Sequence, residues 1–280
     1  MRSWADVDQL PIADGGEGTL DVVRVAVGGE WRTARVDDAF GRERTARWLW
    51  QEERALVEAA EAIPLDETHR DAMSASSRGL GELILAVGAP PGLVVCLGGT
   101  ATVDGGAGLR EVLHELPAPT TVLCDVDAPL VDAARVYARQ KGATDEQIPQ
   151  LEERLLSRPE LESVRALPGA GAAGGLGAAL AALGGELEPG ATRLLDLIGF
   201  DPTGYDLVIT GEGTVDATSA RGKAPGEVAR RCRDAGTRCV VFGGRVVDPL
   251  PGTDTVALSG DPAAAGADLI ALGRALGAAA

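Results

Sequence analysis

Residues 205–229 of this 280-residue chain read YDLVITGEGTVDATSARGKAPGEVA, and this stretch decides the fold class. It opens with a short apolar run, residues 205–210, of the composition that strands prefer. The run is expected to break at Gly211–Gly213, and a polar loop then leads to Pro225, a residue tolerated in the first turn of a helix. A strand that delivers polar side chains to the start of a helix indicates an anion site in an α/β protein.

The polar groups of this loop are the first candidates for a functional site. Thr210 and Glu212 stand where the strand ends, Asp216 offers a carboxylate, and Arg221 and Lys223 offer two cations. The alternative is an ordinary polar loop, because polar loops at strand ends are common.

Composition limits the classes of partner. The net charge of −16 argues against nucleic acid and against anionic membranes, and an anionic substrate would need local cations and backbone N–H groups to hold it. Four cysteines show no CxxC spacing, and two histidines are too few for a metal cage. Without a signal peptide or an 18-residue apolar run, we expect a cytoplasmic protein with no membrane contact.

A second polar loop lies near the start of the chain. Asp14, Gly15, Gly16 and Glu17 separate a brief apolar segment from a helical pattern in residues 20–27. The glycines would let a ligand approach the backbone, and the carboxylates could hold Mg²⁺ or orient a hydroxyl. A tight turn with a capping carboxylate is the alternative.

A glycine-rich loop follows the apolar run at residues 93–97. Gly98 and Gly99 would expose N–H donors to an anion, and Thr100, Thr102 and Asp104 follow at once. The loop lacks the Gly-Lys-Ser/Thr of a Walker A sequence and a convincing GxGxxG pattern. Its glycines alone are therefore a weak signal, which the neighbouring polar residues strengthen.

Three further features continue this pattern of polar and glycine-rich strand ends. Asp125 follows the strand-like residues 121–124, although carboxylates there as often cap the next turn. Lys141 could reach a phosphate, or it could be a solvated surface lysine. Gly174 and Gly175 lie in a third glycine loop, whose alternative is a tightly packed small-residue helix with no ligand.

The alternation of strands and helices indicates a largely parallel sheet. Residues 33–36, 45–50 and 54–57 instead look like a small β-meander, which we expect to belong to a second lobe. Ligand crevices lie at the carboxyl ends of parallel strands, where the glycine and carboxylate loops recur.

Six blocks, in order across nearly the whole chain, resemble the bacterial glycerate kinases of the glycerate 2-kinase type. These blocks are ADGGEGT (13–19), GGTATVDGGAG (98–108), CDVDAPL (124–130), QKGAT (140–144), LPGAGAAGGLGAAL (167–180) and DLVITGEGTVDATSARGKAP (206–225). The resemblance implies transfer of the γ-phosphoryl group of ATP to D-glycerate with Mg²⁺ in the cytoplasm. It also implies an α/β fold, with a flavodoxin-like parallel-sheet domain (residues 1–30 and 195–280) and a second, inserted α/β domain (residues 31–194).

The sequence departs from this family at several places. Family members usually begin with a strand and a D-S-F-K-G-S loop that carries a lysine, and this chain starts just before ADGGEGT. Val103, Thr214 and Thr218 replace an asparagine, an arginine and a glutamine, and the segment between Gly108 and Cys124 is short. We expect either a start further upstream or a reduced relative. In the reduced relative a sheet edge would stay unpaired, and a second copy could cover it as a homodimer.

The resemblance assigns roles to the polar residues. The predicted phosphate contacts are the backbone of Gly98, Gly99, Gly174 and Gly175, with charge balanced by Arg221, Lys223 and Lys141. The predicted Mg²⁺ ligands are Asp14, Asp125 and Glu212, and the proton acceptor is Asp216 or Asp104. The predicted contacts to substrate or nucleotide oxygens are Asp14, Gly15, Gly16, Glu17, Thr100, Thr102, Thr210 and Glu212.

Two other functions stay open from the sequence. A catalytically impaired relative could bind a small anion or a protein partner, because the lysine loop is absent. A kinase for a different hydroxy acid could explain the short 109–123 segment.

Overall fold

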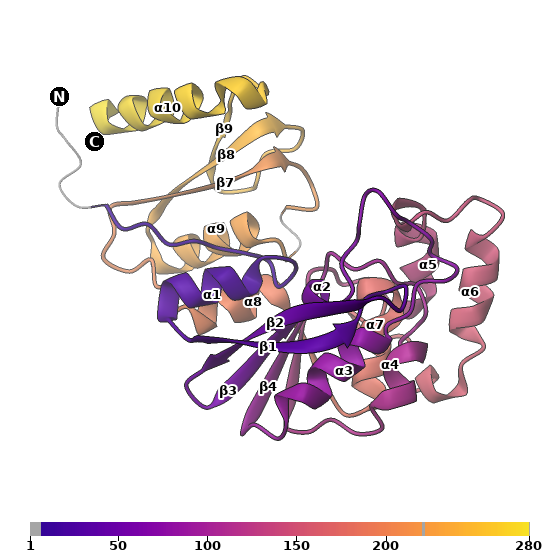
Figure 1. The fold of residues 1–280 in the computed structure, drawn as a ribbon. Helices are drawn as coiled ribbons and strands as arrows, with labels where there is room; N and C mark the ends of the chain where they lie inside the picture. The colour runs from indigo at the N-terminus through magenta and orange to yellow at the C-terminus, as the bar shows by residue number, and fades with distance from the viewer. Residues whose placement is uncertain (1–6, 220–221, 280) are drawn as a thin grey trace. The chain divides into compact units, whose positions relative to one another are not determined.

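The computed structural model describes residues 7–219 and 222–279 (Figure 1). The chain forms two compact units, which are described separately: unit 1 is Met1–Pro11 with Gly199–Ala280, and unit 2 is Ile12–Ile198. These boundaries differ from the predicted domains at residues 195–198, which belong to unit 2, and at residues 12–30. That segment belongs to unit 2, because its helix α1 (Thr19–Val27) packs on strands β2 and β3 and on helix α8 of that unit.

Unit 2 is built on a six-stranded sheet in the order β1-β2-β3-β4-β5-β6. Its strands are β1 (Glu30–Asp37), β2 (Glu43–Gln51), β3 (Arg54–Glu58), β4 (Gly92–Leu97), β5 (Thr120–Cys124) and β6 (Glu186–Pro189). The pairs β1–β2 and β2–β3 are antiparallel, and β3 to β6 are parallel. The predicted α/β class is confirmed.

The meander predicted at residues 31–60 is present, but it forms one edge of this sheet. The reason lies in β3, whose residues Ala55, Leu56 and Val57 are all fully buried. A strand that is apolar on both faces needs a neighbour on each side, and β3 pairs with β4 from Ala55↔Leu93 to Val57↔Val95.

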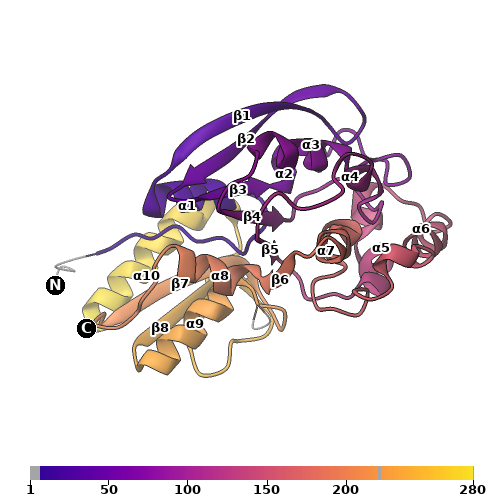
Figure 2. The same cartoon turned by 90° about the horizontal axis from the view of Figure 1, so that it is seen from below.

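Helices cover both faces of the six-stranded sheet (Figure 1, Figure 2). Helices α1 and α8 (Gly190–Leu197) lie on one face, and α3 (Arg78–Val87) and α7 (Ala172–Ala182) lie on the other. The remaining helices of unit 2 are α2 (Ala59–Ala62), α4 (Ala107–Val112), α5 (Ala133–Tyr137) and α6 (Ile148–Leu156), with 3₁₀ turns at Leu130–Asp132, Arg139–Lys141 and Pro159–Leu161.

The core of unit 2 follows these layers. Leu93, Val95 and Leu97 of β4 point from one face into a cluster with the apolar side chains of α3 and α7. A second cluster joins α5, α6 and the far side of α7, where Ala178 and Ala179 leave room for close helix packing. Small residues in α7 therefore serve two contacts at once.

Unit 1 is a parallel three-stranded sheet of β7 (Leu207–Val215), β8 (Arg238–Val246) and β9 (Asp254–Ala257). Figure 1 shows helices α9 (Ala224–Ala235) and α10 (Ala265–Ala279) on opposite faces of this sheet, and a 3₁₀ turn at Pro262–Ala264 precedes α10. The predicted break at Gly211–Gly213 is wrong, because β7 runs on to Val215. A glycine is needed at position 211 within this strand because the ring of Phe242 occupies the space of a side chain. A Cβ at Gly211 would lie 2.6 Å from the ring.

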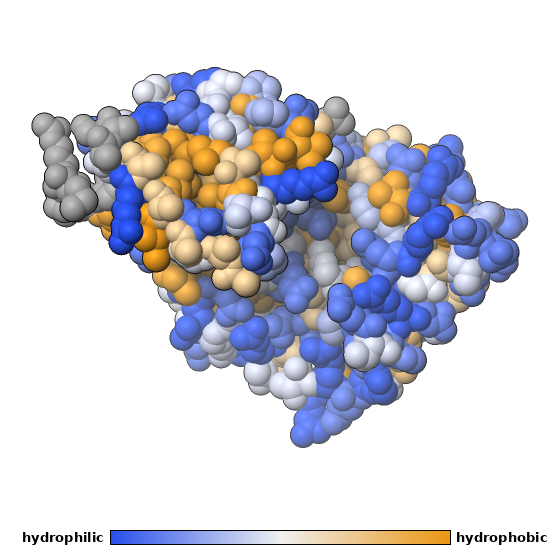
Figure 3. Space-filling view, turned by 90° about the horizontal axis from the view of Figure 1, so that it is seen from above, coloured by the Kyte–Doolittle hydropathy of each residue, from blue (hydrophilic) through white to orange (hydrophobic). Residues whose placement is uncertain are grey.

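Part of unit 1 presents apolar side chains to solvent. Figure 3 shows hydrophobic residues gathered on the face that it displays, and on α10 the side chains of Leu269 and Ile270 are 41% and 58% exposed. Within residues 7–219 and 222–279, every helix is too short or too polar to cross a bilayer.

Candidate functional site at the carboxyl edge of the six-stranded sheet

The parallel strands β3 to β6 end at one edge of the unit 2 sheet, and the loop of residues 13–18 crosses this edge. The crossing is close: a Cβ at Gly98 would lie 2.6 Å from the Cα of Gly16, and one at Gly190 would lie 2.0 Å from the carbonyl oxygen of Asp14. Glycine is therefore required where β4 and β6 meet this loop. The structure therefore brings together the Asp14–Glu17 loop and the glycine-rich loop that begins at Gly98.

Two carboxylates meet at this edge. A Cβ at Gly16 would lie 3.3 Å from Asp14 Oδ1 and 3.6 Å from Asp125 Oδ2, so both oxygens flank the same small volume. Burial, and next the charge of Asp14, raises the pKa of Asp125 to about 6. Two like charges held together in a partly buried site are unfavourable unless a cation joins them.

Lys141, one of the cations that the sequence had suggested, lies close enough to Asp125 for its charge to lower the pKa of that carboxyl. It is 4% exposed, which excludes the solvated surface lysine, and its Nζ donates to Thr100 Oγ1 at 3.2 Å and to the Thr102 carbonyl at 2.9 Å. Burial lowers its pKa to about 8, and the charge of Asp125 opposes that shift. The chain turns away directly after Lys141 because Gly142 adopts a left-handed conformation with φ of 95°.

A cavity of about 80 Å³ lies between these groups. Gly98, Gly99, Thr100, Asp125 and Lys141 line it, together with Leu65, Val126, Tyr137, Gln140 and Ala173. All of these residues belong to unit 2. The cavity thus combines a buried cation, a half-buried carboxylate and glycine backbone.

The third glycine loop reaches the cavity through Ala173. Three consecutive residues, Ala173, Gly174 and Gly175, have positive φ angles of 52°, 70° and 93°. A Cβ at Gly174 would lie 2.0 Å from the Thr102 carbonyl oxygen, so this glycine permits close packing on the glycine-rich loop that follows β4. A contact of Gly174 and Gly175 with phosphate stays a prediction.

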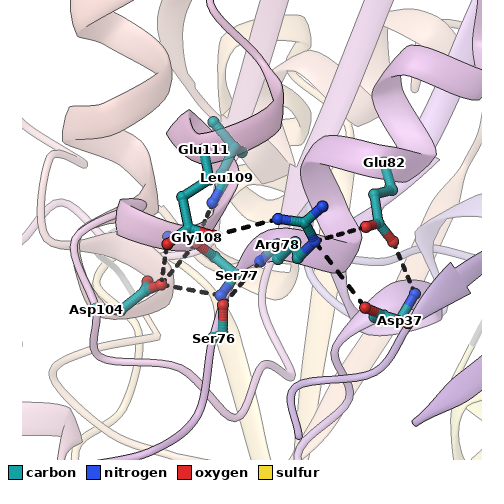
Figure 4. Close-up of polar contacts among 9 residues, drawn as sticks. All are labelled: Asp37, Ser76, Ser77, Arg78, Glu82, Asp104, Gly108, Leu109 and Glu111. Carbon is teal, nitrogen blue, oxygen red and sulfur yellow. Dashed lines mark hydrogen bonds and ion pairs between the residues drawn. The ribbon is translucent and has the colours of Figure 1, made fainter. Parts of the chain in front are cut away.

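Asp104 has a different place from the one that the sequence suggested (Figure 4). Its carboxylate accepts hydrogen bonds from Ser77 N and Ser77 Oγ at 2.9 and 2.8 Å, and from the backbone N–H groups of Gly106 and Gly108 at 3.0 and 3.1 Å. Leu109 N in turn donates to Ser77 Oγ. These hydrogen bonds use the carboxylate to connect the starts of α3 and α4. The role of Asp104 as proton acceptor stays a prediction that this geometry does not support.

Sequence reasoning missed Glu58 at the end of β3. Its carboxylate accepts hydrogen bonds from Gly18 N at 2.9 Å and Leu20 N at 3.3 Å, which caps helix α1 and fixes the Asp14–Gly18 loop. Burial raises the pKa of Glu58, and the backbone hydrogen bonds oppose that shift. The available signal was a carboxylate placed directly after three apolar residues of a strand.

The remaining predicted residues lie in unit 1. Thr210 Oγ1 and Glu212 Oε1 are buried without a hydrogen-bond partner among the described residues, and Lys223 Nζ lies 3.9 Å from Glu212 Oε2. Asp216 accepts hydrogen bonds from Thr218 Oγ1 and Thr218 N, which lower its pKa. Arg221 lies outside the residues that the structure describes.

The fold and this edge define an α/β protein with a small, charged cavity at the carboxyl ends of parallel strands. The comparisons then identify the family. A family model described as "Glycerate kinase family" matches residues 1–115 and 113–257, and the chain belongs to this family.

Relatives and a solved structure agree with this assignment. The chain is 33% identical to the glycerate 2-kinase of Escherichia coli and 34% identical to a glycerate kinase of Bacillus cereus, in each case over 86% of this chain and 77% of the relative. A crystal structure of a "putative glycerate kinase 2" from Salmonella typhimurium LT2 superposes with a TM-score of 0.77 at 28% identity, covering 99% of this chain and 90% of that one.

The comparisons also show where this chain is shorter. The alignment with the Escherichia coli protein spans 292 residues although it takes in 86% of a 280-residue chain, so that protein has internal residues without a counterpart here. The two matches to the family model meet at residues 113–115. This point lies inside the segment that we predicted to be short.

Proposed function

We propose that this chain transfers the γ-phosphoryl group of ATP to a hydroxyl group of D-glycerate. Membership of the glycerate kinase family supports a kinase that acts on glycerate. The observation that carries the proposal is the convergence of Asp14, Asp125 and Lys141 at the carboxyl edge of the six-stranded sheet.

Phosphoryl transfer needs charge neutralisation and alignment more than covalent chemistry from the protein. Lys141 supplies a buried positive charge, and the glycine backbone of Gly98 and Gly99 lets a ligand approach closely. In unit 1, Glu212 and Lys223 are the groups that we assign to the nucleotide, and Arg221 and Asp216 keep their predicted roles.

Mg²⁺ fits the carboxylate pair. Asp14 and Asp125 would hold the ion, since Mg²⁺ is usually bound by one or two carboxylates together with substrate phosphates. In this proposal, phosphate oxygens of the substrate complete the coordination of the ion. When bound, the ion would neutralise phosphate charge and relieve the repulsion between the two carboxylates.

The proposed function is tested by ADP formation in a coupled assay with D-glycerate and Mg²⁺. We expect ADP release that depends on glycerate, with phosphoglycerate identified by ³¹P NMR. A folded protein that binds ATP without transferring phosphate would contradict the proposal and would favour the non-catalytic alternative. A homodimer, which the sequence suggested, stays a prediction for sedimentation analysis.

A further inference from the structure

The cavity beside Lys141 has the size of a small acid. At about 10–15 Å³ for each water-sized group, its 80 Å³ holds roughly six such groups. Glycerate has about seven non-hydrogen atoms and ATP about thirty, so at this scale the cavity has the size of the acid and is too small to enclose a whole nucleotide. The volume of the cavity therefore favours the phosphoryl acceptor, which is the hydroxy acid, as its ligand.

The charge in the cavity points to the same ligand. Among the described residues that line the cavity, Lys141 is the only positively charged one and Asp125, which the proposed function assigns to Mg²⁺, is the only negatively charged one. An ammonium group has three donors, and the described partners Thr100 Oγ1 and Thr102 O take two of them. A buried ammonium group with a donor to spare favours an anionic ligand, because the anion offsets the cost of burying the charge.

We propose that this cavity binds the acceptor and that Lys141 pairs with the acceptor's carboxylate. The inference rests on the proposed function, which supplies a hydroxy acid as the ligand. Thr100 and Tyr137, which line the same cavity, contribute polar groups for the hydroxyls. Lys141 then determines specificity, because a hydroxy acid offers a carboxylate that pairs with the ammonium group and a neutral polyol such as glycerol offers none.

The test measures the binding of D-glycerate and glycerol by calorimetry, without nucleotide. Lys141→Gln keeps donors for Thr100 and Thr102 and removes the charge, and Lys141→Met removes both. We expect D-glycerate to bind at least about 30-fold more weakly to either variant, with glycerol binding unchanged. Arg139→Met is the matched control, because it removes a neighbouring positive charge that is exposed and paired with Asp145.

Steady-state kinetics separate this inference from the proposed function. The inference predicts that K141Q raises the KM for D-glycerate and leaves the KM for ATP within about threefold. A folded K141Q, verified by circular dichroism, that binds D-glycerate with wild-type affinity would overturn it, and so would an increase confined to the KM for ATP. Glycerate binding that depends on Lys141, in a wild-type protein that forms no ADP, would support the inference and refute the proposed function.

Discussion

At the scale of single residues, the buried carboxylates of unit 2 divide into those that hold loops and those that face the cavity. The carboxylate oxygens of Asp104 and Glu58 accept hydrogen bonds from backbone N–H groups at helix starts. Asp125 instead lines the cavity with Lys141. This division predicts different consequences for similar substitutions.

Asp104→Asn should lower stability much more than activity. The amide replaces one acceptor oxygen by a donor that would face backbone N–H groups, and a loss of about 2–4 kcal/mol is expected in the free energy of unfolding. Chemical denaturation measures this loss, and kcat/KM of the folded variant should stay within about threefold of wild type. If the variant were as stable as wild type and at least a hundredfold slower, Asp104 would belong to the chemistry.

Glu58 should give stability a recognisable pH dependence. Its folded pKa is raised above the ordinary 4.5, so the unfolded chain releases this proton first. Protonated Glu58 contributes its full stabilisation of the folded state at pH values below the ordinary pKa. This stabilisation is lost as the pH rises through the raised pKa of the folded state. Glu58→Gln stays neutral, so its stability relative to wild type should increase as the pH rises from about 4 to about 7.

The control for this pH profile is Glu52→Gln, at a side chain that is 70% exposed. An equal slope in both variants would show that Glu58 is not the source of the effect.

The residue scale is also where sequence reasoning was weakest. The sequence identified Lys141 but left open a solvated surface position, because its partners Thr100 and Thr102 lie about forty residues away along the chain. The capping role of Asp104 depends on Ser77, which lies 27 residues earlier in the chain. Such contacts arise from tertiary packing, so local sequence patterns do not predict them.

At the scale of elements, apolar runs and glycines predicted most strands and helices of both units. The strands β6 and β9 and the helix α8 were not predicted, and in β7 the glycines suggested a break although the strand continues. Glycine marks a tight contact as readily as a turn, and only the position of Phe242 distinguishes the two cases.

This explanation of β7 predicts unequal effects for two neighbouring glycines. Gly211→Ala would force a Cβ to within 2.6 Å of the Phe242 ring, whereas Gly213→Ala would meet nothing within 4 Å. Denaturation should show a loss of about 1–3 kcal/mol for the first variant and less than about 0.5 kcal/mol for the second. Equal stabilities would mean that Phe242 does not dictate the glycine.

At the scale of the whole molecule, the net charge of −16 opposes the approach of anionic substrates. Salt screens this repulsion, with a Debye length that shrinks from about 30 Å at 0.01 M to about 8 Å at 0.15 M. We therefore expect kcat/KM for D-glycerate to rise several-fold over this range, in sodium chloride and in choline chloride alike. A fall in both salts would mean that local cations, and not the overall charge, govern encounter.

The sequence predicted the α/β class and the clustering of polar loops at strand ends, because parallel strands place their carboxyl ends on one edge. It did not predict where the two units divide. The segment of residues 12–30 lies in unit 2 because α1 packs on β2 and β3, and that contact depends on residues distant in sequence.

The central claim is that the carboxyl edge of the six-stranded sheet is the phosphoryl-transfer site. The most direct test compares glycerate-dependent ADP formation by Asp125→Asn and by Asp127→Asn, an exposed carboxylate two residues away. We predict that D125N loses at least a hundredfold in rate, about 3 kcal/mol of transition-state stabilisation, and that D127N stays within about twofold of wild type. A folded D125N with the wild-type rate would contradict the claim.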